Sequence, residues 1–246
     1  MAFVIGVAGQ AQMGKDTLAD HLVERLNKKI NKGWPHIHPI DPTPFWKRTA
    51  FADNVKKVYQ DTFDRDRPFI EEWKVKPEPP PGFDMTVRKS LQFIGDGFRK
   101  ICPTIWLDLV FRETEPIIIS DVRYVNEFLR VKKEGGLNIL VGRTDKLSND
   151  PNGSEAQIRP YVKWCLDHYT GSLSDALENV VLIGEETEEC PPDMNKFDLF
   201  VRNDGTIEDL YKSIDEVVLP FVEQFVFQFN EEEAEPEPVN AELVLE

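Results

Sequence analysis

Residues 3–17 read FVIGVAGQAQMGKDT, and this stretch decides the fold class. Its first part, FVIGV, is a short apolar run, which is typical of a β-strand buried on both faces of a parallel sheet. Its second part has two glycines, Gly9 and Gly14, with four residues between them, and lysine, aspartate and threonine follow. A strand that enters such a loop and then a helix is the context in which backbone amides surround a phosphate group. The stretch therefore predicts an α/β fold with a phosphate-binding loop, or P-loop.

The residues after this loop extend the same pattern. Leucines recur every four positions at 18, 22 and 26, which predicts a helix with one buried side. Apolar runs at 116–121 and 137–142 flank a helical pattern at 125–133, and this order implies a right-handed crossover within a parallel sheet. Further strands are expected at 180–183 and 199–201, with a C-terminal helix over 207–229 that Pro220 interrupts. We therefore expect a parallel-sheet P-loop core with helices on both faces.

The middle of the chain predicts a small helical lobe. Proline-rich stretches at 33–44 and 77–82 are expected to be loops, since each proline removes a backbone donor. Residues 51–63 and 87–101 carry apolar residues at helical spacing. We interpret the chain as one domain over 1–230 with the lobe inserted at roughly 45–112. The tail at 231–246 holds seven glutamates and no basic residue, which predicts disorder.

Charge and composition exclude several classes of protein. The formal net charge of −15 disfavours binding to nucleic acid, which depends on Lys and Arg replacing phosphate counterions. Three cysteines without CxxC spacing argue against a disulfide framework or a zinc site, and His36 and His38 lack a recognisable third ligand. There is no apolar run of about 18 residues and no export signal, so we expect a soluble, cytoplasmic protein without membrane contact.

The loop supplies the first candidate site. Glycines allow backbone amides to turn inward around a β-phosphate, while Lys15 bridges the β- and γ-phosphates of ATP. Asp16 stands where serine or threonine usually follows the lysine, so Thr17 or Asp16 is expected in the Mg²⁺ shell, or Asp16 orients an acceptor phosphate. The alternative is a simple glycine turn whose Asp16 complements the helix dipole. The predicted nucleotide-binding residues are Gly9, Gln12, Met13, Gly14, Lys15, Asp16 and Thr17.

A second candidate pair follows the strand at 116–121. Asp121 ends that strand, where ligands bind in open α/β sheets. In an extended chain Asp121 and Arg123 point to the same side, so one acidic and one cationic group would face the crevice, as phosphoryl transfer requires. With Lys15 and Asp16 they are the predicted catalytic residues. The alternative is that Asp121 caps the next helix and pairs with Arg123.

The helical pattern at 87–101 offers a third group. Arg88, Lys89 and Gln92 lie near Gly95 on or beside one face, where a phosphate or a base could dock. The alternative is an ordinary solvated helix face. Trp106 is either a platform for base stacking or part of the core.

Taken together, these residues give the chain a resemblance to the deoxynucleoside monophosphate kinases of tailed bacteriophages. The order and joint presence of the motifs carry the resemblance more than any single motif. The blocks that look like the family's motifs are GQAQMGKDT at 9–17, RKSLQFIGDGFR at 88–99, IWLDLVF at 105–111, IISDVRYVNE at 118–127, SNDPNGSEAQ at 148–157 and VRNDGTIEDLY at 201–211.

The resemblance implies phosphoryl transfer from ATP, with Mg²⁺, to a deoxynucleoside monophosphate, and a supply of DNA precursors during phage replication in the host cytoplasm. Arg123 would hold the acceptor phosphate, and Trp106 and Glu127 would line the pocket for base and sugar. A mobile loop around 143–160 would exclude water. The family has a histidine before its S/T-E-A motif where this chain has Asn152-Gly153, so Glu155 is carried over only weakly. The residues implied to bind the acceptor are Arg88, Lys89, Gly95, Asp96, Trp106, Asp121, Arg123 and Glu127.

Two other functions stay open at this point. One is a different small-molecule P-loop kinase, such as a dephospho-coenzyme A kinase, against which the tryptophan and Asp-x-Arg blocks argue. The other is a non-catalytic nucleotide-binding module whose acidic tail recruits a partner. The accepted bases and the oligomeric state are not determined by the sequence, and a homodimer is one open possibility.

Overall fold

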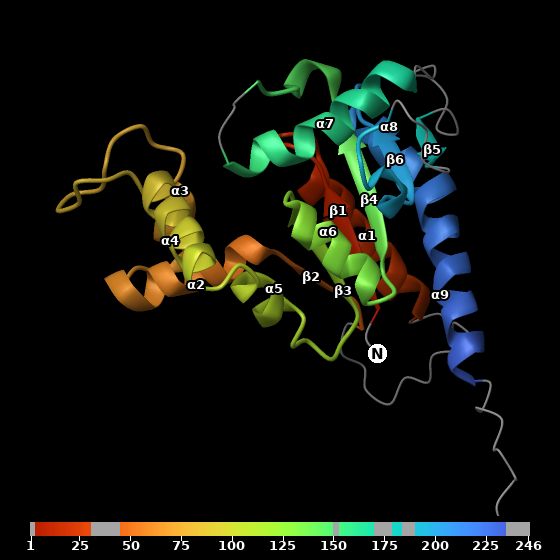
Figure 1. Ribbon diagram of the computed structural model, residues 1–246, viewed down its shortest axis with the longest axis horizontal. Helices are drawn as coiled ribbons and strands as arrows, with labels where there is room; N and C mark the ends of the chain where they lie inside the picture. The colour runs from red at the N-terminus through yellow and green to blue at the C-terminus, as the bar shows by residue number, and fades with distance from the viewer. Residues whose placement is uncertain (1–2, 31–44, 150–152, 170–178, 184–189, 235–246) are drawn as a thin grey trace, which may run out of the picture.

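The computed structural model describes residues 3–30, 45–149, 153–169, 179–183 and 190–234 (Figure 1). The proline-rich stretch at 33–44, the pair His36 and His38, and Asn152 lie outside these residues. The description of side chains ends at 226.

A six-stranded sheet forms the centre of the molecule, with strand order β2-β3-β1-β4-β6-β5. All neighbouring strands are parallel except β5, which runs antiparallel to β6. The predicted α/β fold with a mostly parallel sheet is therefore confirmed. The strands are β1 (Val4–Ala8), β2 (Lys47–Thr49), β3 (Ile117–Val122), β4 (Leu137–Gly142), β5 (Val180–Leu182) and β6 (Leu199–Arg202).

Helices cover both faces of this sheet (Figure 1). The chain passes from β1 through α1 toward β2 and from β3 through α6 toward β4, which are opposite directions across the sheet. Right-handed crossovers therefore place α1 and α6 on opposite faces. Helices α8 and α9 pack beside α1, and α7 packs on β4. The bounds are α1 (Lys15–Ile30), α6 (Val125–Lys133), α7 (Gly153–His168), α8 (Ile207–Ser213) and α9 (Leu219–Ala234).

The apolar runs of the central strands explain the core. Ile5 and Val7 of β1, Ile118 of β3 and Ile139 and Leu140 of β4 are buried, so these strands are enclosed on both faces. Near-continuous apolar strands of this kind require helices on both sides of the sheet, because no face is left for water.

The segment between β2 and β3 forms the helical lobe, which projects to the left in Figure 1. Its helices are α2 (Phe51–Phe63), α3 (Arg67–Trp73), α4 (Val87–Ile101) and α5 (Ile105–Val110). Predicted bounds for α2 and α4 agree with the structure, whereas α3 and α5 were not predicted. Lys47–Thr49, inside the segment assigned to the lobe, is a strand that pairs with β3.

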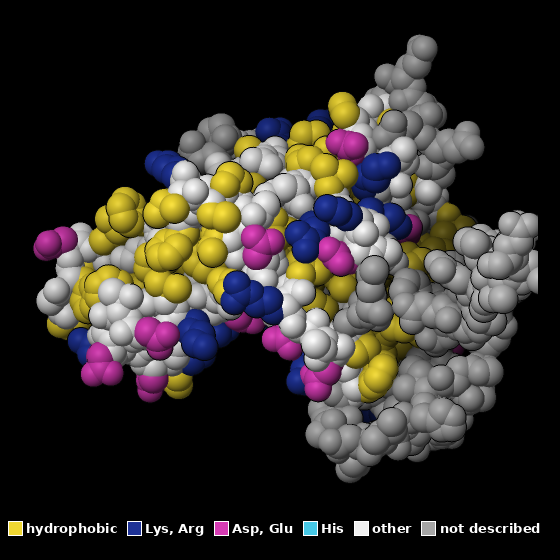
Figure 2. Space-filling view, turned by 60° about the horizontal axis from the view of Figure 1, so that its bottom comes forward, with side chains coloured by type: hydrophobic (Ala, Val, Ile, Leu, Met, Phe, Trp, Pro, Cys, Tyr) yellow, Lys and Arg dark blue, Asp and Glu magenta, His cyan; other side chains and the backbone are white. Residues whose placement is uncertain are grey.

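The lobe has its own small core and an apolar surface. Tyr59, Ile70 and Val87 are buried together between α2, α3 and α4. Figure 2 shows apolar side chains gathered on the outer surface of the lobe, and Phe93 and Ile101 of α4 are 73% and 84% exposed. The lobe therefore has a small apolar interior and also exposes apolar side chains on its outer surface.

Two predicted elements are wrong in detail. Residues 153–160, expected within a mobile loop, are the first half of α7, because the buried Ile158, Val162 and Cys165 follow helical spacing in spite of Pro160. The single helix over 207–229 is divided by a π-helical turn at Ile214–Val218, which lies before Pro220. Proline has no N–H for the usual bond and its ring collides with the carbonyl four residues earlier, so the helix widens upstream.

The C-terminal end is only partly described. Helix α9 continues to Ala234, so residues 231–234 of the predicted tail have a helical backbone. Residues 235–246 lie outside the described part of the chain.

Candidate functional site

The loop between β1 and α1 has a backbone conformation that requires glycine at two positions. Gly9, Gln12 and Gly14 have φ angles of 145°, 62° and 92°. A Cβ atom on Gly9 would lie 2.5 Å from the Val141 carbonyl oxygen, and one on Gly14 would lie 2.4 Å from the Asn203 Nδ2 atom. Positive φ angles and these close approaches explain why both positions are glycine.

Lys15 begins α1 and is almost fully buried, with 5% of its surface exposed. Its Nζ atom donates to the backbone carbonyl of Gln10. Burial, together with the nearby positive charge of Arg123, lowers the pKa of Lys15 to about 8. The ammonium group is thus held inside the loop, where it is poorly solvated and would gain by meeting an anion.

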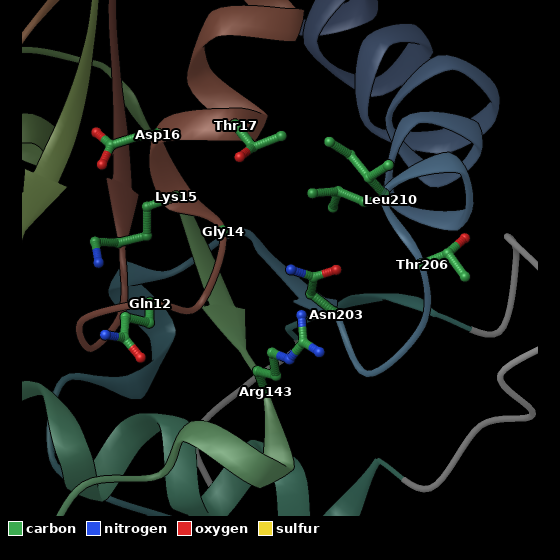
Figure 3. A pocket seen from close by; sticks show the side chains of 10 residues that line it. Gln12, Gly14, Lys15, Asp16, Thr17, Arg143, Asn203, Thr206 and Leu210 are labelled. Carbon is green, nitrogen blue, oxygen red and sulfur yellow. The ribbon is translucent and has the colours of Figure 1, made fainter.

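A cavity of about 340 Å³ opens beside the loop (Figure 3). Its wall combines polar groups from the loop and α1 with residues that follow β4 and β6. Ile207 and Leu210 of α8 supply an apolar portion. The lining residues are Gln12, Gly14, Lys15, Asp16, Thr17, Arg143, Asn203, Thr206, Ile207 and Leu210.

Asn203 connects this cavity to the sheet. Its side-chain amide donates to the Met13 carbonyl at 3.0 Å, and its backbone N–H donates to the Gly142 carbonyl at 2.8 Å. The side chain of Met13 is buried, so only the backbone of this predicted residue faces the loop interior. The residues Arg143, Asn203, Thr206, Ile207 and Leu210 were not predicted as site residues. The Asn-Asp-Gly turn directly after the strand at 199–201 was the signal that could have identified them.

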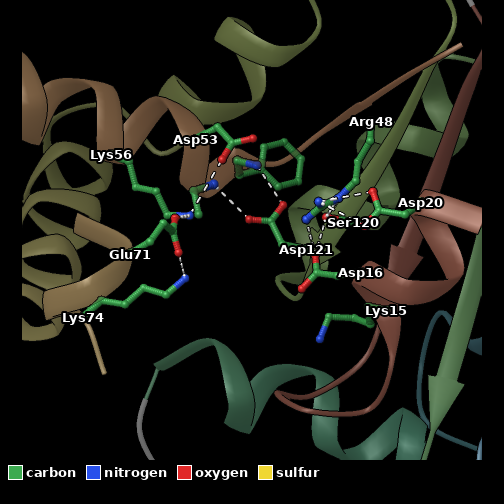
Figure 4. A network of polar contacts seen from close by, with 12 residues as sticks. Lys15, Asp16, Asp20, Arg48, Asp53, Lys56, Glu71, Lys74, Ser120 and Asp121 are labelled. Atoms are coloured by element: carbon green, nitrogen blue, oxygen red, sulfur yellow. Dashed lines mark hydrogen bonds and ion pairs between the residues drawn. The ribbon is translucent and has the colours of Figure 1, made fainter. Parts of the chain in front are cut away.

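Asp16 is held by two groups from the neighbouring part of the sheet (Figure 4). Its Oδ1 atom accepts hydrogen bonds from the Arg48 guanidinium and from the Ser120 hydroxyl, the latter at 2.9 Å. The Arg48 Nε atom also donates to the Ser120 Oγ atom at 3.1 Å. Asp16 therefore does more than complement the helix dipole, and Arg48 and Ser120 join the site as residues that were not predicted.

Asp121 caps a helix, which is the alternative role considered for it above, although the helix is not the one expected. Its two carboxylate oxygens accept the backbone N–H groups of Phe51 and Ala52 at 2.8 and 2.9 Å. The capped helix is α2 of the lobe and not α6, which follows Asp121 in sequence (Figure 4). Burial raises the pKa of Asp121 above its ordinary value. Sequence proximity suggested the wrong helix because the two partners are brought together only by the pairing of β2 with β3.

Arg123 and Glu155 form an ion pair directly beside the loop. The second carboxylate oxygen of Glu155 accepts the backbone N–H of Ala11 at 2.9 Å. The Arg123 Nε atom is buried and has no hydrogen-bond partner among the described residues. Arg123 thus lies close enough to the loop for its charge to lower the pKa of Lys15, and Glu155 bridges Arg123 and the Ala11 amide.

Glu127 contacts the backbone of Arg123, one partner of this ion pair, and is 3% exposed. Its Oε2 atom accepts the backbone N–H groups of Arg123 and Tyr124 at 2.8 and 3.0 Å, and its Oε1 atom lies 3.4 Å from the Arg99 guanidinium. Burial, and next the negative charge of Asp121, raise the pKa of Glu127 to about 7. Glu127 is therefore a buried carboxyl group that supports the backbone at Arg123.

The predicted residues of α4 are divided between the core and the surface. Arg88, Lys89, Gln92 and Asp96 are exposed on the lobe, and Gly95 is buried. Trp106 is 2% exposed, and its indole N–H donates to the Gly95 carbonyl at 3.0 Å. The indole of Trp106 is thus part of the core, which is the second of the two interpretations given for it above.

The described residues show neither a preformed metal site nor a helix that could span a membrane. No group of three or more His, Cys, Asp or Glu side chains is arranged to hold a metal ion by itself. None of the described helices combines the length and the apolar composition that a membrane span needs.

Comparisons with known proteins give one distant relative. No protein-family model matches the chain. A protein of Acanthamoeba polyphaga mimivirus, provisionally named a deoxynucleotide monophosphate kinase, is 28% identical over 177 residues, which are 63% of this chain and 82% of that protein. That relative is from a mimivirus and not from a bacteriophage.

A comparison of structures finds a protein from Chloroflexus aurantiacus J-10-fl, provisionally named a kinase, whose crystal structure was solved at 1.70 Å. It matches with a TM-score of 0.33 and 12% identity over 94% of this chain and 97% of that chain. At that TM-score the match does not bear on function. The sequence match shows that the chain is distantly homologous to a viral protein with the name given above.

Proposed function

We propose that this chain is a kinase that transfers the γ-phosphoryl group of ATP to a deoxynucleoside monophosphate. The observation that carries the proposal is the meeting of Lys15, Arg123 and the Ala11 amide around one place beside the loop. Two cations and a backbone donor at a helix N-terminus form a site for phosphate groups and for the charge that develops on a transferring phosphoryl group.

The cavity supports binding of a nucleotide at this loop. A volume of about 340 Å³ lies in the range of small-molecule pockets. Its polar end is formed by the loop, and its apolar portion by Ile207 and Leu210 suits the face of a base. Arg143 and Lys15 are the cations of the wall. We expect ATP to bind with its phosphates at the loop and its base toward α8.

The oxygen groups at the start of α1 fit Mg²⁺ binding in the presence of ATP. Thr17 and Asp16 both line the cavity and supply the hard oxygen ligands that Mg²⁺ prefers. When bound, Mg²⁺ would neutralise charge on the β- and γ-phosphates. Arg48 and Ser120 hold the Asp16 carboxylate in place, so we expect Thr17 to be the more direct ligand.

The acceptor is expected between Arg123 and the lobe. An oxygen of the acceptor phosphate attacks the γ-phosphorus in line with the oxygen that bridges to the β-phosphate, and that bridging bond breaks to release ADP. Lys15 and Arg123 neutralise the charge of the transferring group. No general base is needed, because the acceptor phosphate is already ionised near neutral pH. The deoxynucleoside class rests on the mimivirus relative and on the motif resemblance, and the role in phage replication stays a prediction.

The test is ADP formation from ATP and Mg²⁺ with each deoxynucleoside monophosphate, each ribonucleoside monophosphate and dephospho-coenzyme A in separate reactions. We expect turnover that depends on a deoxynucleoside monophosphate and that falls at least about 100-fold in Arg123→Ala, the range seen when one donor to a transition-state charge is removed. Arg112→Ala, at an exposed position after α5, is the matched control and should keep its activity. ADP formation indifferent to every acceptor would show an ATPase instead.

A further inference from the structure

Glu155 occupies a place that suits a phosphate group better than it suits a carboxylate. One of its oxygens pairs with the Arg123 guanidinium, and the other accepts the Ala11 amide at 2.9 Å. The Ala11 amide belongs to the loop, and the Arg123 guanidinium lies beside it. A carboxylate offers two oxygens in a plane, whereas a phosphate offers three to four in a tetrahedron, so a phosphate can satisfy more donors at the same point.

A buried donor beside Glu155 points to such a ligand. The Arg123 Nε atom is buried and has no hydrogen-bond partner among the described residues, although Nη1 of the same guanidinium is paired with Glu155. A buried N–H without a partner is costly. A phosphate can take Nε and a terminal nitrogen together in a bidentate contact, and this contact satisfies the donor that the carboxylate leaves unpaired.

The position of Glu155 does not depend on its carboxylate alone. The side chain of Gln10 donates to the backbone carbonyls of Glu155 and Ser148 at 3.1 and 3.2 Å and accepts the Ser148 N–H at 2.9 Å. Buried Ile158 and Val162 anchor the rest of α7 in the core. The beginning of α7 is therefore attached to the loop by the amide of Gln10, so neutralising Glu155 should leave the segment in place.

We propose that Glu155 is an internal competitor that occupies the site of a phosphate group in the nucleotide-free protein and lowers the affinity for that phosphate. The inference rests on the proposed function insofar as the ligand is a phosphate of ATP or of the acceptor. Either phosphate presents the same chemistry to Arg123 and Ala11. Glu155 must release the Ala11 N–H before a phosphate can use it, because one N–H group makes one strong hydrogen bond and two anions beside Arg123 repel each other.

The opposite role for Glu155 predicts a different result. If the carboxylate oriented Arg123 for catalysis, its removal would lower kcat and would leave phosphate affinity unchanged or weaker. If it competes, its removal strengthens binding. The substitution Glu155→Gln retains the shape and an acceptor for the Ala11 N–H but removes the charge that attracts Arg123.

The experiment is calorimetric titration of the full chain with ATP alone and with each deoxynucleoside monophosphate alone, so that no turnover occurs. We expect Glu155→Gln to bind one of these ligands about tenfold more tightly, because a charge-assisted hydrogen bond exceeds a neutral one by about 1 to 1.5 kcal/mol. Tighter binding of ATP identifies the ligand as a phosphate of ATP, and tighter binding of the monophosphate identifies it as the acceptor phosphate. Glu72→Gln removes the charge of a surface ion pair on α3 and should change neither affinity.

A double-mutant cycle with Arg123→Ala completes the test. The gain from Glu155→Gln should disappear when Arg123 is absent, since the competition acts through that guanidinium. Thermal unfolding of all four proteins establishes that each is folded. Unchanged or weaker binding by folded Glu155→Gln overturns the proposal, as does a gain that persists without Arg123. Since binding is measured without turnover, the result stands whether or not acceptor-dependent ADP formation is found.

Discussion

The buried Glu127 carboxyl group predicts a stability that depends on pH. Its pKa in the folded protein is about 7, against an ordinary value of 4.5, because burial and the charge of Asp121 disfavour ionisation. A group whose pKa is raised on folding stabilises the protein below its unfolded pKa, and this stabilisation is lost as pH rises through the folded pKa. From these two values, the wild-type protein should lose about 2 kcal/mol between pH 5.5 and pH 8 through this group alone.

Glu127→Gln removes the ionisation and retains an acceptor for the backbone N–H groups of Arg123 and Tyr124. The assay is urea unfolding of both proteins at several pH values from 5.5 to 8. The difference in the free energy of unfolding should move by about 2 kcal/mol in favour of the variant as pH rises. The same comparison for Glu72→Gln, on the surface of the lobe, controls for general charge effects. Parallel curves for wild type and Glu127→Gln across this range would refute the reasoning.

Three further predictions concern the loop and its supports. Since the pKa of Lys15 is lowered to about 8 and phosphates bind the ammonium form, ATP affinity should fall about tenfold from pH 7 to pH 9; calorimetry of Lys15→Gln should show no such trend. Asp121→Ala leaves two N–H groups of α2 without acceptors and should lower the free energy of unfolding by about 1 to 2 kcal/mol, whereas a loss below about 0.3 kcal/mol would contradict the capping role. Asn203→Ala removes the hydrogen bond to the Met13 carbonyl, so it should weaken ATP binding in calorimetry and lower the free energy of unfolding in urea by about 1 kcal/mol. Unchanged ATP affinity would argue against a role of Asn203 in supporting the loop.

Elements with a strong local pattern were predicted from the sequence with accurate bounds. Helices α2 and α4 have apolar residues at helical spacing, and β4 is an apolar run interrupted only by Asn138. Strand β2 was missed because its residues are Lys47, Arg48 and Thr49, which form a strand only by pairing their backbone with β3. Three polar residues at the edge of a sheet have no alternation of apolar and polar side chains from which a strand could be predicted.

The candidate site also has a part that the sequence predicts and a part that only the tertiary structure shows. The loop at 9–17 could be predicted because its chemistry lies in one contiguous stretch. Its partners Arg48 and Asn203 are far away in sequence and reach the loop only through the strand order of the sheet. The sequence left two roles open for Asp121 and for Trp106, because each depends on a contact in the lobe, with the first turn of α2 and with Gly95.

The two hydrogen bonds that Asp121 accepts from the start of α2 have a mechanical consequence. The lobe is joined to the sheet by the chain at both ends, at the end of β2 and at the start of β3, and Asp121 is a third point of attachment. Rotation of the lobe about this pivot leaves its root nearly stationary, while displacement grows toward α3 and α4, which lie farther out (Figure 1). Arg123 is only two residues from Asp121. A rotation of the lobe that moves the outer helices would therefore leave the Arg123 guanidinium at nearly the same distance from the loop.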